Sequence, residues 1–141
     1  MRSVDDCIFC KIVSGDTPCF KVTEDDLTLV FLDLFPVNEG HTLVIPKEHF
    51  HDLFEIDGPT LAAVAAASLR VAHAIDTALG AEGLGVFQLN RAAAGQTVFH
   101  YHMHLLPRNT GDPLALHSRV RGEDSALRET AERIRRALSP R

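Results

Sequence analysis

The sequence predicts an α+β fold in which about five antiparallel strands form one sheet and a long helix covers one of its faces. Two observations lead to this fold class. Short apolar runs joined by brief polar links recur before residue 50 and again after residue 80, and short links favour antiparallel pairing. Between them, apolar residues recur at helical spacing from Leu61 to Leu79. The 141 residues fit a single domain, 1–141.

The first half of the chain contains a short helix and three strands. Residues 7–15 are expected to form one or two helical turns that stop at Gly15. The runs FKVTED and LTLVFLDL predict two strands that are joined as a hairpin around Glu24–Asp26. PVNEG then predicts a turn, and HTLVIP predicts a third strand that ends at Pro46.

The second half begins with the long helix, for which Asp57–Pro59 is the start signal and Gly80 the stop. The runs LGVFQLN and TVFHYHMHLLP predict two further strands on either side of the small-residue loop RAAAGQ. Residues 109–122 show no regular pattern. Residues 124–138 predict a charged, amphipathic last helix.

Composition excludes several classes of function. The net charge is −5 and the pI is near 5.9, whereas a protein that binds duplex nucleic acid is usually more basic. The start of the chain has no long apolar run behind a basic cluster, and no stretch approaches the ~18–20 apolar residues of a membrane span. We therefore expect neither a nucleic-acid nor a membrane partner. Three cysteines without a secretory signal indicate a cytoplasmic location.

Three histidines alternate near the end of the predicted sheet. In a strand, His100, His102 and His104 would point to one face, because side chains alternate. The residues between and beside them would then point into the core: Phe99, Tyr101, Met103 and Leu105. A row of three imidazoles on one face indicates binding or catalysis.

Two chemistries fit this row. The preceding loop AAAGQT is small and flexible enough to bring backbone N–H groups to an anion, which indicates a phosphate site. Alternate histidines are common metal ligands, so a zinc hydrolase that uses all three is one interpretation. A neutral imidazole is also a usable nucleophile toward phosphorus, and its neighbours would stabilise the charge on the oxygens.

Three separate segments resemble the histidine triad (HIT) superfamily, and in particular its Hint-like bacterial branch. GQTVFHYHMHLLPR resembles the superfamily signature, in which histidines alternate with apolar residues. FLDLFPVNEGHTLVIPKEHF and CIFCKI are similar to two further segments of its members. The resemblance covers residues 7–110 and implies the HIT-like fold, whereas the tail and helix at 111–141 carry little of it.

The resemblance implies catalysis by a histidine nucleophile. In the family the middle histidine attacks the α-phosphate of a nucleotide, and that position is His102 here. His104 would donate a hydrogen bond to the phosphate oxygens, and the backbone carbonyl of His100 would hold the His102 ring with Nε2 free. His41 matches a fourth family histidine beside the triad. No metal takes part in this chemistry.

The resemblance also implies which residues hold the substrate. Asp33 matches a carboxylate that accepts hydrogen bonds from both ribose hydroxyls, as one carboxylate can. An apolar slot for the base corresponds to four positions that could equally be plain core: Phe9, Ile12, Phe31 and Leu34. Contacts to the phosphate and the leaving group correspond to Asn90, Gly95, Gln96 and Thr97. Arg91 departs from the family pattern, because many relatives have a small residue there.

A second group of residues has the composition of a zinc site. Cys7 and Cys10 form a C-x-x-C pair, which alone is compatible with metal binding, redox activity or neither. Some bacterial family members combine such a pair with two histidines, which correspond to His49 and His100 here. Two thiolates and two imidazoles suit tetrahedral zinc. We expect a structural zinc ion; the alternative is a pair of reduced cysteines.

The function implied by the resemblance is hydrolysis of a purine nucleoside phosphoramidate to a nucleoside monophosphate. Alternatives among enzymes are cleavage of dinucleoside polyphosphates or of adenylyl sulfate. An alternative of another class is a nucleotide-binding regulatory protein in which turnover is incidental. The family usually forms a two-fold dimer through the long helix and a sheet edge, so we expect a homodimer.

Overall fold

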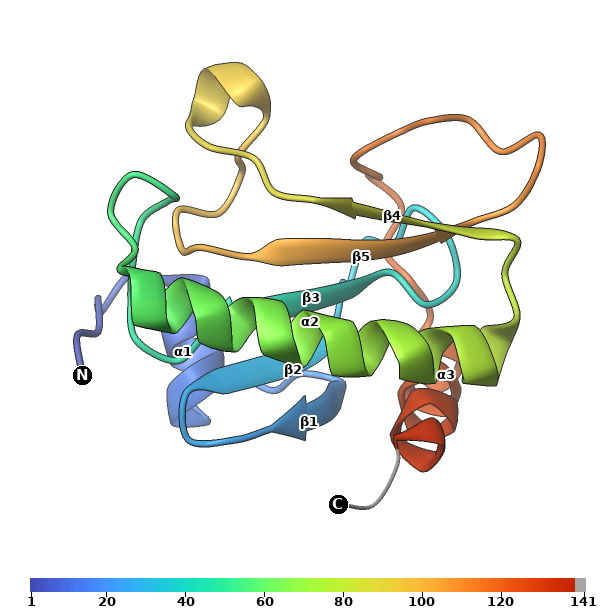
Figure 1. The fold of residues 1–141 in the computed structure, drawn as a ribbon, viewed down its shortest axis with the longest axis horizontal. Coiled ribbons are helices and arrows are strands. Elements are labelled where there is room, and N and C mark those ends of the chain that lie inside the picture. Colours follow the sequence, from blue (N-terminus) through green and yellow to red (C-terminus); the bar gives the residue numbers. More distant parts are fainter. Residues whose placement is uncertain (139–141) are drawn as a thin grey trace.

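The computed structural model describes residues 1–138, so the last three residues of the predicted 111–141 tail lie outside it. Within this range, five strands form one antiparallel sheet in the order β1-β2-β3-β5-β4 (Figure 1). The strands are β1 Lys21–Glu24, β2 Thr28–Leu32, β3 Thr42–Pro46, β4 Gly83–Phe87 and β5 Met103–Arg108. The helices are α1 Ile8–Ser14, α2 Gly58–Leu79 and α3 Asp124–Ala137, with a short 3-10 turn at Ala92–Ala94. The predicted fold class is confirmed.

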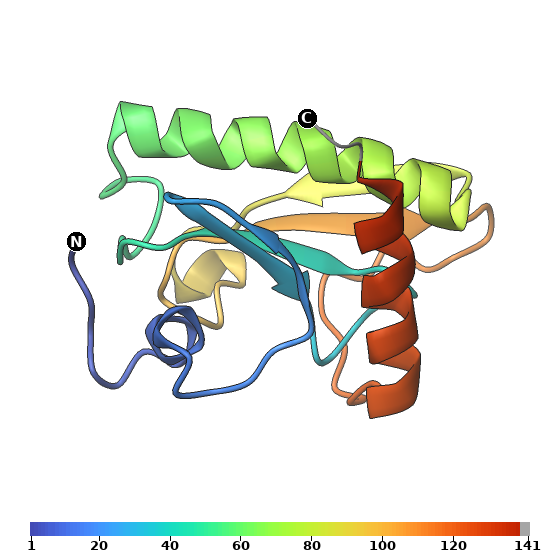
Figure 2. The ribbon, with the colours of Figure 1, turned by 90° about the horizontal axis from the view of Figure 1, so that it is seen from below.

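The sheet separates two apolar clusters on its opposite faces. α2 runs along one face with α3 beside it, whereas α1 lies on the other side of the sheet (Figure 2). The larger cluster joins the sheet to α2 and α3 and includes Val30, Val44, Val64, Val71, Ile75, Leu105, Leu127 and Ile134. The smaller cluster lies under α1 and contains Phe9, Leu29, Phe31, Leu43 and Ile45. The candidate site is built on this second face.

The helix ends follow the predicted signals. The Asp57 carboxylate caps α2 by accepting a hydrogen bond from the Thr60 N–H at 2.7 Å. Gly80 ends α2 in the left-handed conformation, and Gly15 ends α1 in the same way. Local residue choice therefore fixes the length of both helices.

The turn between β2 and β3 requires a glycine. Gly40 has φ 87°, and a Cβ atom there would overlap the Leu79 side chain and approach Pro107 Cγ to 3.1 Å. Both the backbone conformation and the lack of space exclude a larger residue. Because His41 follows directly, this tight turn fixes the position of the first site histidine.

The predicted strand at residues 97–107 is shorter in the structure, because β5 begins only at Met103. Its partner β3 ends at Pro46, which has no N–H to extend the ladder. The Tyr101 N–H instead bonds to the Phe50 carbonyl oxygen at 2.7 Å. The first two histidines of the row therefore lie in irregular backbone before the strand.

One prediction for this segment holds and one is wrong. All three histidines face the α1 side of the sheet, because the Phe9 ring of α1 meets the rings of both His100 and His102, and the His102 and His104 ring centroids lie 4.9 Å apart. His100 is the one that contacts the cysteines of α1. Phe99 does not enter the core; it is 41% exposed and stacks on the His51 ring with centroids 4.8 Å apart. Tyr101 and Leu105 are buried in the core as predicted.

α2 is the one helix within residues 1–138 whose length and composition would allow it to cross a membrane. No run of that length in the sequence is free of polar residues, and α2 itself contains Arg70 and Asp76. Its buried face, which includes Val64 and Val71, packs on the sheet. α2 is thus the central core helix of the domain.

Candidate active site and metal centre

A cavity of about 540 Å³ opens on the face of the sheet opposite α2. Its walls come from α1, from β2 and the residues that follow it, from the loop before β5, and from residues 117–119. Most of the predicted substrate and catalytic residues line it: Phe9, Ile12, Phe31, Asp33, Leu34, Thr97, His102 and His104. The structure therefore brings one large part of the predicted site together around a space of ligand size.

Aromatic and aliphatic side chains form the apolar end of the cavity. Phe9 meets Phe31 edge to face, with ring centroids 5.4 Å apart, and meets His102 in the same way at 5.2 Å. Both phenylalanines are also core residues of the smaller cluster. Ile12 packs partly against that cluster and lines the cavity as well. These side chains thus belong to the core and also line the cavity.

His102 is held in one tautomer by the backbone. Its Nδ1 lies 2.7 Å from the carbonyl oxygen of His100, and a carbonyl only accepts, so Nδ1 carries the proton. Nε2 is then left with a free lone pair. The ring is 7% exposed, and burial lowers its pKa. The predicted orientation of His102 is present: a neutral imidazole with Nε2 available as a nucleophile.

His41 and His104 form a directional hydrogen-bond chain. The Val37 N–H donates to His41 Nδ1 at 3.1 Å, so the His41 proton is on Nε2, which donates to His104 Nδ1 at 2.9 Å. The His104 proton is therefore on Nε2. Burial lowers the pKa of His41 to about 4 and that of His104 to about 2, so both rings are neutral at pH 7.

The end of this chain is a donor without a partner. Within the described part of the molecule, His104 Nε2 is a buried side-chain atom that makes no hydrogen bond. An unsatisfied buried N–H is costly. A phosphate oxygen in the cavity beside His102 would satisfy it, because a donor held ready in a dry site stabilises negative charge.

Asp33 is the carboxylate of the cavity lining. One of its oxygens accepts the Phe35 N–H at 2.9 Å, and the other lies 3.7 Å from His41 Nε2. Burial raises the pKa of Asp33. Its position at the end of β2, between the apolar slot and the histidines, is suited to a ribose.

The loop between β4 and β5 differs in part from the prediction. Gln96 does not line the cavity: its side chain accepts from the Arg91 N–H at 2.6 Å and donates to the His51 carbonyl at 2.7 Å. Asn90 accepts from the Leu53 N–H at 2.8 Å and is also absent from the lining. Both side chains brace the loop instead of reaching the cavity.

Arg91 takes an unusual backbone conformation in this loop. Its φ is 73°, the one positive value for a non-glycine residue within 1–138. Its carbonyl accepts from the Gln96 N–H, and its guanidinium lies 4.3 Å from the centre of the Phe54 ring. These contacts hold a conformation that glycine would adopt freely. The loop keeps its turn, closed by Gly95 at φ 102°, despite the unusual residue.

A second group of side chains meets beside the first turn of α1. Cys7, Cys10, His49 and His100 place their Sγ and Nδ1 atoms within 4.8 Å of one another. His100 Nδ1 is 3.5 Å from each sulfur and 3.2 Å from His49 Nδ1. His100 Nε2 donates to the Pro46 carbonyl at 2.8 Å, so the lone pair of Nδ1 faces the group.

These distances fit tetrahedral zinc. Bond lengths of about 2.3 Å to sulfur and 2.0–2.1 Å to nitrogen place neighbouring ligand atoms roughly 3.3–3.8 Å apart. Cys7 and Cys10 lie one helical turn apart, so that their sulfurs share one side of α1. The Pro46 carbonyl also orients the His100 ring, as a second hydrogen bond does for many zinc-bound histidines.

The geometry does not support a zinc ion held by the three alternating histidines. His100 faces the cysteines, and His102 uses Nδ1 for a hydrogen bond. No metal-compatible group within residues 1–138 contains all three. A group of Asp33, His41 and His104 does come close together, but the nitrogens of His41 and Nδ1 of His104 are already paired.

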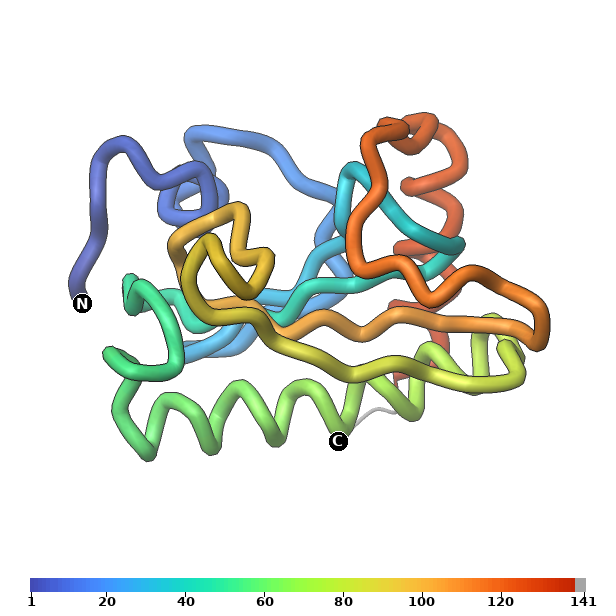
Figure 3. Tube along the Cα trace, turned by 90° about the horizontal axis from the view of Figure 1, so that it is seen from above, coloured from blue at the N-terminus to red at the C-terminus, as the bar shows by residue number. Residues whose placement is uncertain are grey.

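Sequence reasoning missed one wall of the cavity. We call residues 113–122 the strap; its members His117, Ser118 and Arg119 line the cavity. The strap comes from the irregular segment that follows β5 and runs over the sheet toward α3 (Figure 3). Its residues follow no periodic pattern, so only their place after the histidine row could have drawn attention to them.

The fold and site define an α+β protein with a buried, neutral histidine cluster at the wall of an elongated cavity. The model of the HIT domain matches residues 14–111. The chain belongs to the HIT family.

Named relatives and solved structures agree with this assignment. The chain is 38% identical to "Adenylylsulfatase HINT3" of Arabidopsis thaliana, over 92% of this chain and 66% of that protein, slightly less than two thirds. It is 43% identical to "Adenosine 5'-monophosphoramidase hnt1" of Schizosaccharomyces pombe, over 72% and 74%. A zinc-bound histidine triad family protein from Mycobacterium smegmatis superposes with a TM-score of 0.84 at 42% identity, covering 94% and 93% of the two chains.

Proposed function

We propose that this protein hydrolyses purine nucleoside 5′-phosphoramidates at the α-phosphate, with His102 as the nucleophile and a nucleoside monophosphate as the product. One observation carries the proposal: His102 presents an unprotonated Nε2 to the cavity beside the unpartnered N–H of His104. The names of the Schizosaccharomyces and Arabidopsis relatives support a hydrolase that acts on nucleotides.

The first step is attack of His102 Nε2 on the α-phosphorus. An Nε2–P bond forms, the bond from phosphorus to the leaving nitrogen breaks, and the departing amine takes up a proton from water. The imidazole becomes positively charged, and its Nδ1–H remains on the His100 carbonyl, which stabilises that charge. His104 Nε2–H donates to a non-bridging oxygen, where negative charge increases in the transition state.

The second step returns the enzyme to its starting form. Water attacks the phosphorus of the nucleotidyl-histidine, the Nε2–P bond breaks, and the monophosphate leaves. His102 regains its free Nε2 because the ring proton stays on Nδ1, which donates it in a hydrogen bond to the His100 carbonyl throughout. The low pKa of His41 and His104 keeps the relay to the phosphate neutral and correctly oriented throughout.

The substrate is held at its other end by contacts away from the reaction. The base lies between Phe9, Phe31 and their apolar neighbours, and Asp33 accepts hydrogen bonds from both ribose hydroxyls. Thr97 lies beside the phosphate, whereas the N–H groups of Gly95 and Gln96 are bonded to carbonyl oxygens within the loop, and Gln96 and Asn90 keep that loop in shape. These contacts place the α-phosphorus next to His102.

The assay that tests the proposal compares adenosine 5′-phosphoramidate with its 2′-deoxy analogue in wild type and in Asp33→Asn. We expect wild type to prefer the ribonucleotide by about 10-fold or more in kcat/KM. With the 2′-deoxy analogue the Asp33 carboxylate loses the hydrogen bond from the 2′-hydroxyl. Asp33→Asn should lose most of that preference, and Asp25→Asn, a hairpin aspartate outside the cavity, should keep it. A diadenosine polyphosphate cleaved faster than the phosphoramidate would favour the alternative hydrolase, and no turnover of either would favour a binding protein.

We also propose that Cys7, Cys10, His49 and His100 hold a structural zinc ion. All four ligands come from the protein, so the ion would have no open position for chemistry and would serve to join α1 to the sheet. It would also steady the His100 backbone, whose carbonyl orients His102. Because the set needs two thiolates, a reducing, cytoplasmic environment is part of this proposal.

A homodimer is the assembly that fits the exposed surfaces. β4 is an edge strand of the sheet, with Leu84 and Val86 exposed at 37% and 55%. Leu69 and several alanines are exposed on neighbouring α2. An uncovered edge strand beside an apolar helix face is a surface that proteins usually cover.

Val86→Asp tests this assembly. We expect wild type to sediment as two chains and the variant as one, because an aspartate at the sheet edge introduces an uncompensated charge into the interface. The matched change Val120→Asp, on the exposed strap, should leave the sedimentation coefficient unchanged. A wild type that sediments as one chain at micromolar concentration would exclude the dimer.

A further inference from the structure

The strap crosses the cavity and is fastened along its length. Arg108 holds its first part by donating to the carbonyl oxygens of Pro113 and Ala115 at 2.8 and 2.6 Å. At its other end, the Gly122 N–H bonds to the Leu34 carbonyl at 2.7 Å. Between these points the strap is joined to the loop between β4 and β5, residues 88–102, which we call the phosphate loop because the proposed function places the phosphate beside it. The strap is therefore a fixed wall of the cavity.

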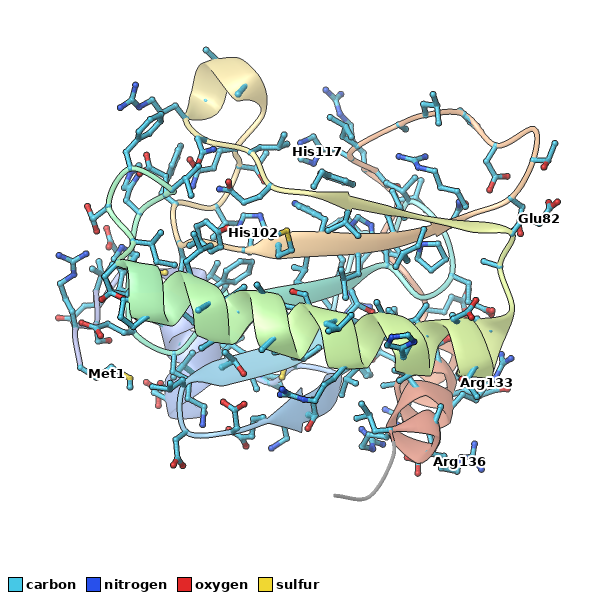
Figure 4. All side chains as sticks on the ribbon, in the orientation of Figure 1. Met1, Glu82, His102, His117, Arg133 and Arg136 are labelled. Atoms are coloured by element: carbon cyan, nitrogen blue, oxygen red, sulfur yellow. The ribbon has the colours of Figure 1, made fainter. Side chains whose placement is uncertain are left out.

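His117 is the residue that joins the strap to the phosphate loop. Its Nε2–H donates to the Gly95 carbonyl at 2.8 Å, and its ring centroid lies 6.3 Å from that of His104. Figure 4 shows His117 on the strap, on the same side of the sheet as the loop before β5, with His102 beside the start of β5.

Arg119 is a cation of the cavity wall without a carboxylate partner in the described chain. The other strap arginine, Arg121, pairs with Asp124 at 2.7 Å. Arg119 forms no ion pair within residues 1–138. The carboxylate that lines the same cavity is Asp33, which the proposed function assigns to the ribose. An arginine that lines a cavity and lacks an internal anion is suited to a negatively charged ligand group.

The other walls of the cavity are assigned to the rest of the substrate, so the strap is the wall that remains for the departing group. The base and ribose occupy the end formed by α1 and β2, and the α-phosphate lies at His102 and His104. Gln96, which family resemblance places beside the leaving group, uses both ends of its side chain inside the loop. Besides Thr97, the polar groups left to contact the leaving group are those of the strap.

We propose that His117 and Arg119 bind the leaving group and select one that carries negative charge close to the scissile bond. This inference rests on the proposed function and narrows its substrate class. Phosphoramidates whose amine bears a carboxylate belong to this class, and so do anhydrides of a nucleotide with an inorganic oxyacid such as sulfate. A leaving group that is neutral at the same position, such as the ammonia of the unsubstituted phosphoramidate, is cleaved with a lower kcat/KM.

A matched pair of substrates isolates this charge. Adenosine 5′-phosphoramidate of glycine and that of glycinamide differ by one carboxylate, while base, ribose, phosphate and scissile bond are the same. We expect wild type to have a kcat/KM about 10-fold or more higher for the glycine compound. The ratio should fall close to one in Arg119→Gln and in His117→Asn, and should reverse in Arg119→Glu.

Each outcome of this experiment decides the question. Arg121→Gln, on the same strap but paired outside the cavity, should keep the wild-type ratio. A wild-type ratio near one, or a ratio that survives in all three variants, would overturn the inference while the hydrolase function stands. Failure of wild type to cleave either compound would overturn this inference, and failure to cleave unsubstituted adenosine 5′-phosphoramidate in the same assay would overturn the proposed function as well. Unchanged circular dichroism and Tm exclude misfolding of the variants.

Discussion

His102→Ala is expected to lower kcat for adenosine 5′-phosphoramidate by about 10⁴-fold or more, because removal of a nucleophile leaves only binding and charge stabilisation. KM should change far less, since Phe9, Phe31 and Asp33 still hold the nucleotide. Steady-state kinetics on wild type and variant measure both effects.

The control for this variant is another histidine. His73→Ala removes an exposed imidazole from α2, on the opposite face of the sheet, and should leave kcat within twofold of wild type. A His102→Ala enzyme that keeps more than a tenth of wild-type kcat would exclude His102 as the nucleophile. A thermal unfolding scan confirms that loss of the buried ring has not unfolded the domain.

Loss of the metal is expected to have the largest effect on stability. Purified protein should contain one zinc ion per chain, and Cys10→Ser should contain none. We expect the free energy of unfolding to fall by more than about 3 kcal/mol, roughly 10 °C in Tm for a chain of this size. Metal analysis and calorimetry on the same samples test both parts.

The third cysteine provides the control for this change. Cys19 lies outside the four-residue metal group, so Cys19→Ser should keep one zinc ion and most of the stability. Chelation below the Tm of the metal-free protein should leave turnover measurable, because the reaction needs no metal. Immediate loss of all turnover in protein that is still folded would instead favour a catalytic metal.

The sequence predicted the helix ends and the strand positions well, because these depend on residues that are close together in the chain. Asp57 and Gly80 bound α2 in the sequence and in the structure, and short apolar runs between turn signals located every strand. The segment resemblance also located the two groups of site residues, since His41 and His104 meet at 2.9 Å although they lie 63 residues apart.

What could not be predicted depends on contacts between distant segments. The end of β3 at Pro46 shortens β5, so that His100 and His102 lie in irregular backbone, which no pattern within residues 97–107 reveals. The Gln96 side chain is hydrogen-bonded to the backbone of Arg91 and His51, and these bonds exist only after the loop has folded. His117 contacts Gly95, which lies 22 residues earlier in the chain, from an irregular segment, so its role had no periodic signal.

The central claim is a covalent nucleotidyl-histidine on His102, and the intact mass of the protein tests it most directly. Wild type and His102→Ala are mixed with adenosine 5′-phosphoramidate, quenched within seconds and weighed by mass spectrometry. The account predicts a transient mass increase of one adenylyl group in wild type, mapped by peptide analysis to His102, and none in the variant. Substrate turnover by His102→Ala at a rate near that of wild type would contradict it.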